Sequence, residues 1–204
     1  MADVLIIDIR KMDVKKYIHL SGLGLLLACC MASAADHVTV NFTANISEGA
    51  CTVTLPGSSA INFGTIDPAT LIGANEQFAT PTPFNVHVKC SGLGPADAVP
   101  KLTLTGEVIS DTGASPDAKK LFRTDTGSAS KGFGVAIMPG ITPDWSKILT
   151  NSATTPVTGD FAGSSGVNVP FISAVACGTT ADCGAAKLKA GSLAAAVTFT
   201  FVYK

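Results

Sequence analysis

Apolar and polar residues alternate one by one along much of this 204-residue chain. This alternation places successive side chains on opposite faces of a strand, whereas an amphipathic helix needs apolar residues three or four positions apart. The alternating runs are rich in Thr and Val, whose β-branched side chains suit a pleated surface. The expected strands lie at 38–42, 51–55, 84–88, 102–104, 132–137, 169–171 and 197–203.

Clusters of Pro, Gly, Ser and Asp separate these runs, and such clusters are typical of turns and loops. They occupy residues 55–59, 91–97, 110–117, 138–144 and 161–166. Short strands joined by frequent turns predict an all-β fold, an antiparallel sandwich of the immunoglobulin-like type. Because no linker or repeat interrupts the pattern, we expect one domain.

Residues 1–34 have the pattern of a secretory signal peptide. Lys15 and Lys16 precede an apolar run at 20–31, which ends in the small-residue site Ala32-Ser33-Ala34. The run is shorter than the roughly 20 residues that a transmembrane helix needs. We therefore expect an exported mature chain that begins at Ala35. Because the segment before Met12 contains acidic residues, we expect translation to start at Met12.

A lipoprotein is the alternative interpretation of this segment, since Leu26-Leu27-Ala28-Cys29 resembles a lipidation site. The leucine just before the Ala-Cys pair fits that motif poorly, and the Ala-Ser-Ala site downstream fits signal cleavage well. The sequence therefore favours cleavage after residue 34.

The expected mature chain holds four cysteines, Cys51, Cys90, Cys177 and Cys183. An even number in an exported chain indicates disulfides, and four cysteines allow three connectivities. Their order in the sequence favours Cys51 with Cys90 and Cys177 with Cys183.

Charged residues make up only 14% of the chain, with 14 basic against 15 acidic side chains. This balance lacks the basic excess of a nucleic-acid-binding protein, so no nucleic acid is expected as a partner. The mature chain contains no hydrolase, metalloprotease or nucleotide-binding motif, which indicates that it is not an enzyme. With no CxxC pair and only His37 and His87, neither a metal site nor another cofactor is expected.

The two ends of the mature chain each carry an apolar strand face. An N-terminal arm at 35–48 alternates through Val38, Val40, Phe42 and Ala44. At the other end, alternate residues from Gly191 to Tyr203 share one face. Taken alone, this pattern also fits two ordinary sandwich strands that each bury one face.

Several motifs together resemble the subunits of chaperone–usher pili, the fimbrial pilins of Gram-negative bacteria. The arm leads into Cys51-Thr-Val53, and residues 61–66 (INFGTI) are similar to the family's strand with a central Phe-Gly. Residues 84–90 resemble its strand ending in the second cysteine, 39 positions after the first. Gly191, fourteenth from the end, and the penultimate Tyr203 resemble its C-terminal motif. The resemblance covers residues 35–204.

The resemblance implies an incomplete immunoglobulin-like sandwich that lacks its last strand and is completed by a donor strand from another chain. The division would be a signal peptide at 1–34, a donor-strand arm at 35–48 and a pilin domain at 49–204. The implied donor residues are Val38, Val40, Phe42 and Ala44. The implied acceptor groove and chaperone-binding residues are Gly191, Leu193, Val197, Phe199, Phe201, Tyr203 and Lys204.

The implied partners are a periplasmic pilus chaperone, an outer-membrane usher and neighbouring pilin subunits in a head-to-tail polymer. The chain would pass through the periplasm to the cell surface and serve there as a structural subunit of a fimbria that supports adhesion. The alternative is a minor, adaptor or tip-associated subunit that binds a host glycan or protein receptor. The single Trp145 could stack on a sugar, although a lone Trp is more often packed inside a protein.

Overall fold

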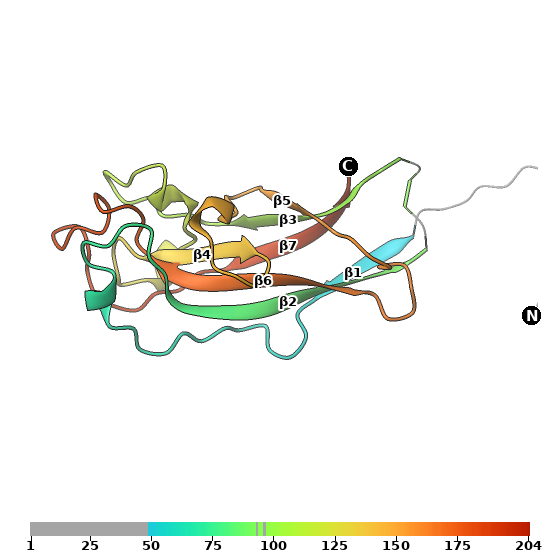
Figure 1. Ribbon diagram of the computed structural model, residues 1–204, viewed down its shortest axis with the longest axis horizontal. Helices are drawn as coiled ribbons and strands as arrows, with labels where there is room; N and C mark the ends of the chain where they lie inside the picture. Colours follow the sequence, from blue (N-terminus) through green and yellow to red (C-terminus); the bar gives the residue numbers. More distant parts are fainter. Residues whose placement is uncertain (1–48, 93, 96) are drawn as a thin grey trace, which may run out of the picture. The chain divides into compact units, whose positions relative to one another are not determined.

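The computed structural model describes residues 49–92, 94–95 and 97–204 (Figure 1). The expected signal peptide at 1–34 and the expected donor residues Val38, Val40, Phe42 and Ala44 lie outside the described residues. The part that is described contains seven β-strands and four short 3₁₀ helices, and it contains no α-helix. No helix in this part is therefore long and apolar enough to cross a bilayer.

The strands are β1 (Ala50–Thr54), β2 (Ala79–Ser91), β3 (Pro100–Gly106), β4 (Gly134–Pro139), β5 (Thr154–Pro156), β6 (Val167–Ala176) and β7 (Val197–Tyr203). The 3₁₀ helices are η1 (Pro68–Thr70), η2 (Ala118–Lys120), η3 (Asp125–Gly127) and η4 (Trp145–Lys147). Six strands coincide with alternating runs of the sequence, which confirms the all-β prediction.

Two antiparallel sheets form the sandwich, with strand orders β1-β2-β6-β4 and β5-β3-β7. A constant-type immunoglobulin domain has one sheet of strands A, B, E and D, and a second sheet of strands C, F and G. In chain order, β1, β2, β6 and β4 take the places of A, B, E and D, while β3 and β7 take those of C and F. Within the described residues β7 pairs with β3 alone, so the place of strand G is empty.

The main core lies between the two sheets and contains apolar side chains from both. Those of β2, β3 and β6 are almost completely buried, and each contributes roughly 1.5–3 kcal/mol relative to exposure. Its members include Val86, Val88, Leu102, Leu104, Phe122 and Phe171.

A second core cluster covers the outer side of β4 and β6, and it buries side chains on both faces of these strands. Trp145 packs on this cluster, and its ring centroid lies 5.4 Å from that of Phe78. The indole therefore contributes to a packed cluster, which is the commoner of the two roles considered for a lone Trp.

One expected strand is not formed, and another is shorter than expected. Residues 61–66 are irregular, because the Asn62 side chain accepts a hydrogen bond from the Gly64 backbone N (2.8 Å) and Gly64 has a φ of +68°. Residues 190–196 are also outside any strand, so the terminal strand is shorter than the alternation predicts. Here Ser192 and Ala194 bind the 124–130 loop through backbone hydrogen bonds of 2.8–2.9 Å.

A buried arginine and its aspartate partners connect three loop segments, which contain Asp111, Arg123 with Asp125, and Gly132. The Arg123 side chain, only 3% exposed, donates two hydrogen bonds to Asp111 (2.6 and 2.7 Å) and two to Asp125 (2.9 and 2.8 Å). Asp111 also accepts from the Gly132 backbone N (3.0 Å). The hydrogen bonds from Arg123 are the main reason that the pKa of Asp111 is lowered from 3.8 to about 2.

This network predicts a pH-dependent stability. Because the pKa of Asp111 is lower in the folded state, its contribution is complete above about pH 4 and is lost as the pH falls towards 2. We expect Asp111→Asn to lower the free energy of unfolding by about 2 kcal/mol at pH 6, and this difference to shrink below pH 4. Urea denaturation between pH 6 and 2 measures it. A difference that stays constant over this range would contradict the role of the ion pair.

Candidate functional site

A groove of about 400 Å³ lies between the edge strands β1 and β7. These strands belong to different sheets, so the groove opens the side of the sandwich where the sheets are not joined by hydrogen bonds. The lining residues are Gly49, Cys51, Val53, Phe199, Thr200, Phe201, Val202 and Tyr203. Four of them, Phe199, Phe201, Tyr203 and Cys51, are large or polarisable side chains that stay only half-buried.

Aromatic side chains of β7 form one wall of the groove. The Phe199 ring lies 4.9 Å from that of Phe171 and 6.1 Å from that of Phe84, measured between centroids. The Phe201 ring lies 6.1 Å from that of Phe161. Phe199 and Phe201 thus rest on the main core with one side and remain partly exposed on the other. An apolar strand laid over them would remove this exposed area from water.

The opposite wall is the short strand β1, which a disulfide fastens to β2. Cys51 lies directly across from Cys90 in the antiparallel pair, and their sulfur atoms are bonded. Val53 follows on the same face and is also half-buried against the main core. The disulfide therefore fixes the position of an edge strand that has only five residues.

Tyr203 closes one end of the groove. Its hydroxyl lies 3.8 Å from the Cys51 sulfur on the opposite wall, and its ring meets that of Phe201 edge to face at 4.9 Å. Gly94 lies so close beneath the Tyr203 ring that an added Cβ would overlap it. Lys204 continues the pairing beyond β7 through two backbone hydrogen bonds with Val99 (2.8 and 3.1 Å).

Both walls present an open backbone edge to the groove. Within the described residues β1 pairs only with β2, and β7 only with β3. Unpaired N–H and C=O groups along an edge strand can bind another extended chain. The groove therefore offers apolar contacts and backbone hydrogen bonds to the same ligand.

The structure brings together only part of the expected acceptor set. Phe199, Phe201 and Tyr203 line the groove. Val197 and Leu193 also pack on the core but do not line the groove, and Leu193 contacts two core clusters. Gly191 lies against the backbone of Ala129 and Ser130, where a Cβ would come within 2.8 Å of main-chain atoms. Because Gly191 has no side chain, its backbone can lie close to that of Ala129 and Ser130, outside the groove.

The β1 side of the groove is not among the residues predicted from the sequence. Cys51 and Val53 belong to the run at 51–55 that was correctly predicted as a strand, and its alternation marks which side chains face inward; Gly49 directly precedes β1. The alternation does not indicate that β1 lies at the edge of its sheet, opposite β7.

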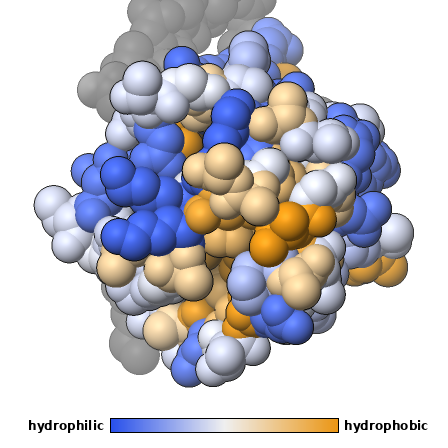
Figure 2. Space-filling view, turned by 90° about the vertical axis from the view of Figure 1, so that its left-hand side faces the viewer, coloured by the Kyte–Doolittle hydropathy of each residue, from blue (hydrophilic) through white to orange (hydrophobic). Residues whose placement is uncertain are grey.

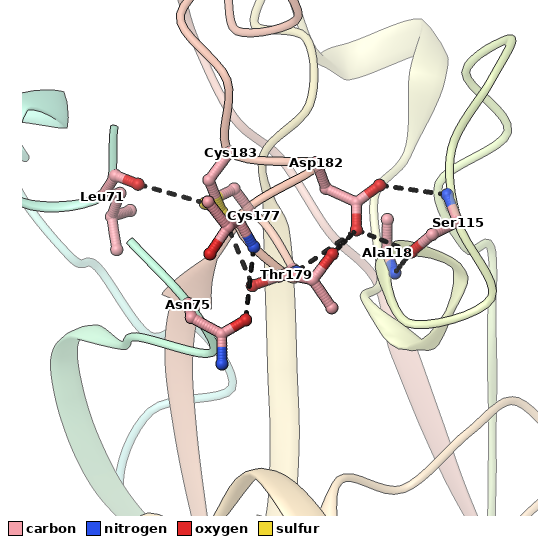
Figure 3. Close-up of a disulfide and its surroundings, with 10 residues drawn as sticks. Leu71, Asn75, Ser115, Ala118, Cys177, Thr179, Asp182 and Cys183 are labelled. Carbon is pink, nitrogen blue, oxygen red and sulfur yellow. Dashed lines mark hydrogen bonds between the residues drawn. A yellow bond between two sulfur atoms is a disulfide. The ribbon is translucent and has the colours of Figure 1, made fainter. Parts of the chain in front are cut away.

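The second disulfide, Cys177–Cys183, lies at the opposite end of the sandwich, because it follows the last residue of β6 whereas Cys51 and Cys90 lie near the first (Figure 1). Both expected pairings are thus confirmed. Beside it, the Asp182 carboxylate accepts hydrogen bonds from the backbone N and hydroxyl of both Ser115 (3.1 and 2.6 Å) and Thr179 (3.2 and 2.9 Å; Figure 3). Burial opposes the charge, but these hydrogen bonds lower the pKa of Asp182 overall.

An immunoglobulin-like sandwich with a groove that combines aromatic side chains and two unpaired backbone edges defines a class of protein suited to binding an extended strand. The chain belongs to the Fimbrial protein family, whose sequence model matches residues 40–204. The resemblance to fimbrial subunits is thereby confirmed.

Among solved structures, the chain is similar to the CupB6 tip adhesin from Pseudomonas aeruginosa, with 19% identity and a TM-score of 0.42. The similarity covers 63% of this chain and 30% of the adhesin, so the matched part is less than a third of that protein. A comparison with curated proteins gives no match.

The two disulfides should differ in their contribution to stability. The Cys51–Cys90 bond closes a loop of 39 residues and the Cys177–Cys183 bond a loop of 6. Loop-closure entropy then predicts that replacing the first pair by alanine costs about 4 kcal/mol, and replacing the second about 2 kcal/mol. Urea denaturation of the two double variants measures both losses. An equal or larger loss of stability for the Cys177–Cys183 pair would contradict the prediction that the longer closed loop gives the larger stabilisation.

Proposed function

We propose that the chain is a structural subunit of a surface fimbria, assembled when its groove accepts the N-terminal strand of a neighbouring subunit. The observation that carries the proposal is the groove between β1 and β7, with half-buried aromatic side chains and an open edge on each wall. A strand inserted beside β7 would occupy the place of strand G and complete the sandwich.

The arm of this sequence has the composition and length for that role. Val38, Val40, Phe42 and Ala44 alternate over seven residues, and β7 is also seven residues long. Burial of the three larger side chains contributes roughly 5–9 kcal/mol before the costs of association. Each backbone hydrogen bond adds about 1 kcal/mol.

The other proposed partners would be needed because the groove is exposed before assembly. An apolar edge that stays open would pair with unrelated strands and aggregate. We propose that a periplasmic pilus chaperone fills the groove first, in contact with the carboxylate of Lys204, and that an outer-membrane usher exchanges its strand for the arm of the next subunit. Because each subunit uses its arm on one neighbour and its groove on another, the contact does not close and a filament forms.

The donor side can be tested with changes in the arm. In the double variant Val40→Asp and Phe42→Asp, two carboxylates would have to enter an apolar groove, whose desolvation cost prevents insertion. We expect chaperone binding to remain while incorporation into fimbriae is lost. Electron microscopy and gel analysis of sheared fimbriae measure incorporation.

The matched control for this test is Thr39→Asp with Asn41→Asp, because these residues alternate with the apolar ones in the sequence and would face away from the groove in an inserted strand. Assembly should persist in the control. Wild-type amounts of fimbriae from the Val40→Asp and Phe42→Asp variant would refute the donor role of the arm.

The acceptor side is tested by Phe199→Asp, which places a charge in the aromatic wall. We expect the loss of chaperone capture and degradation of the subunit in the periplasm, since the groove no longer offers an apolar surface. Thr198→Asp is the control, because Thr198 is exposed on the other face of the same strand. Co-purification with the chaperone from periplasmic extracts distinguishes the two. Equal capture of both variants would contradict the groove as the binding site.

A further inference from the structure

The end of the sandwich farthest from Tyr203 has a surface of its own, here called the end face. It consists of residues 68–76, 111–118, 128–132 and 178–190. Figure 2 looks onto this end of the molecule and shows apolar side chains gathered near its centre, with hydrophilic ones around them.

Small and apolar residues make up much of the end face. In the 68–76 loop, Ile72 is 45% exposed. In the 178–190 loop, Ala181, Ala185 and Ala186 are exposed. A hollow of about 310 Å³ lies among residues of three of these loops, including Ala114 and Ala186. A surface of short side chains permits another backbone to approach closely.

The loops of the end face hold one another in place. The Cys177–Cys183 disulfide closes one of them, and Asp182 binds the 111–118 loop through Ser115 (Figure 3). The 68–76 loop is joined to it by backbone hydrogen bonds from Gly73 N to Cys183 O (2.8 Å) and from Glu76 N to Gly178 O (2.9 Å). Such an ordered surface loses little entropy when a partner binds.

The direction of an inserted strand brings its owner to this end. All strand pairs of the sandwich are antiparallel, so a strand in the place of strand G runs opposite to β7. If the seven residues 38–44 pair with the seven residues of β7, Val38 would lie near Tyr203 and Ala44 near Val197. The donor chain therefore leaves the groove at the start of β7.

The connection to the donor's sandwich is short. Only residues 45–48 separate Ala44 from Gly49, and an extended chain spans at most about 3.6 Å per residue, so the reach over these five steps is at most roughly 18 Å. From Val197 the acceptor chain continues back along residues 191–196 to Lys189, which pairs with Lys131 of the end face. The connection would run along this segment. Because it is so short, it would keep the donor's sandwich close to the end face of the acceptor.

Charge also fits this placement. The connection carries one charged residue, Glu48. The exposed Lys131 and Lys187 line the hollow of the end face together with Asp111 and Asp182, and neither lysine forms an ion pair with the residues that the structure describes. The two carboxylates are already bound, Asp111 by Arg123 and Asp182 by Ser115 and Thr179. An acidic connection that runs past two such lysines is favoured over a basic one.

We propose that the end face seats the sandwich of the next copy of this chain, through the surface around that copy's Gly49. This surface includes Gly92, which lies directly beside Gly49, and the 159–166 loop, whose Phe161 backbone binds Cys90. The inference rests on the proposed donor-strand assembly and adds a second, rigid contact to it. The loop closed by Cys177–Cys183 then belongs to an interface inside the filament.

Site-specific photo-cross-linking in assembled fimbriae tests the proposal. A benzophenone amino acid replaces Ala181 in one variant and Ile72 in another, both exposed on the end face. A third variant carries it at Asn85, which is exposed on the outer side of β2. After irradiation, dimers are isolated and the tryptic peptide 90–101 of the neighbouring copy is sought by mass spectrometry.

We expect cross-links from Ala181 and Ile72 to that peptide, and none to it from Asn85. Fimbriae that assemble with the probes but yield no such cross-link, or only a cross-link to a different protein, overturn the proposed interface and leave donor-strand assembly standing. A failure of the wild-type chain to form any polymer overturns the proposed function itself, and the end-face contact with it.

Discussion

The half-buried aromatic wall of β7 is the constraint on which the rest of the structure depends. Phe199 and Phe201 pack on the core with one side, yet no described strand covers the other. An edge strand that is both apolar and unpaired is a liability for any exported protein. The proposed donor strand would cover this face. The remaining features suit such a ligand, since a disulfide fixes the facing wall and Tyr203 closes one end of the groove.

Much of the sandwich could be predicted from the sequence because the side-chain period of a strand is two, and the runs at 51–55, 84–88 and 197–203 show it clearly. The failures have local causes. At 61–66 the pattern is apolar, but the Asn62 side chain and Gly64 bend the backbone out of an extended path. At 191–196 the alternation continues, but the backbone partners belong to the 124–130 loop and not to β3.

The groove was predicted only in part, since alternation marks the inward face of a strand but not its place in a sheet. Phe199, Phe201 and Tyr203 were found because they end the chain in a recognisable motif. Cys51 and Val53 complete the groove only through the strand order, which brings the edge of one sheet opposite the edge of the other. Such a long-range relation has no local signal in a single sequence.

The two disulfides occupy opposite ends of the sandwich, and each stabilises a surface that binding would use. Cys51–Cys90 holds the wall from which the arm of the same chain departs, while Cys177–Cys183 orders the loops beyond the start of β7. An arm that leaves one end of its own sandwich and enters the groove of another emerges at that partner's far end. In the proposed assembly only four residues of sequence would separate the two sandwiches, so strand insertion would also bring together two ordered surfaces. In such an arrangement, the inserted strand resists separation of the subunits, and contact between the sandwiches limits their bending.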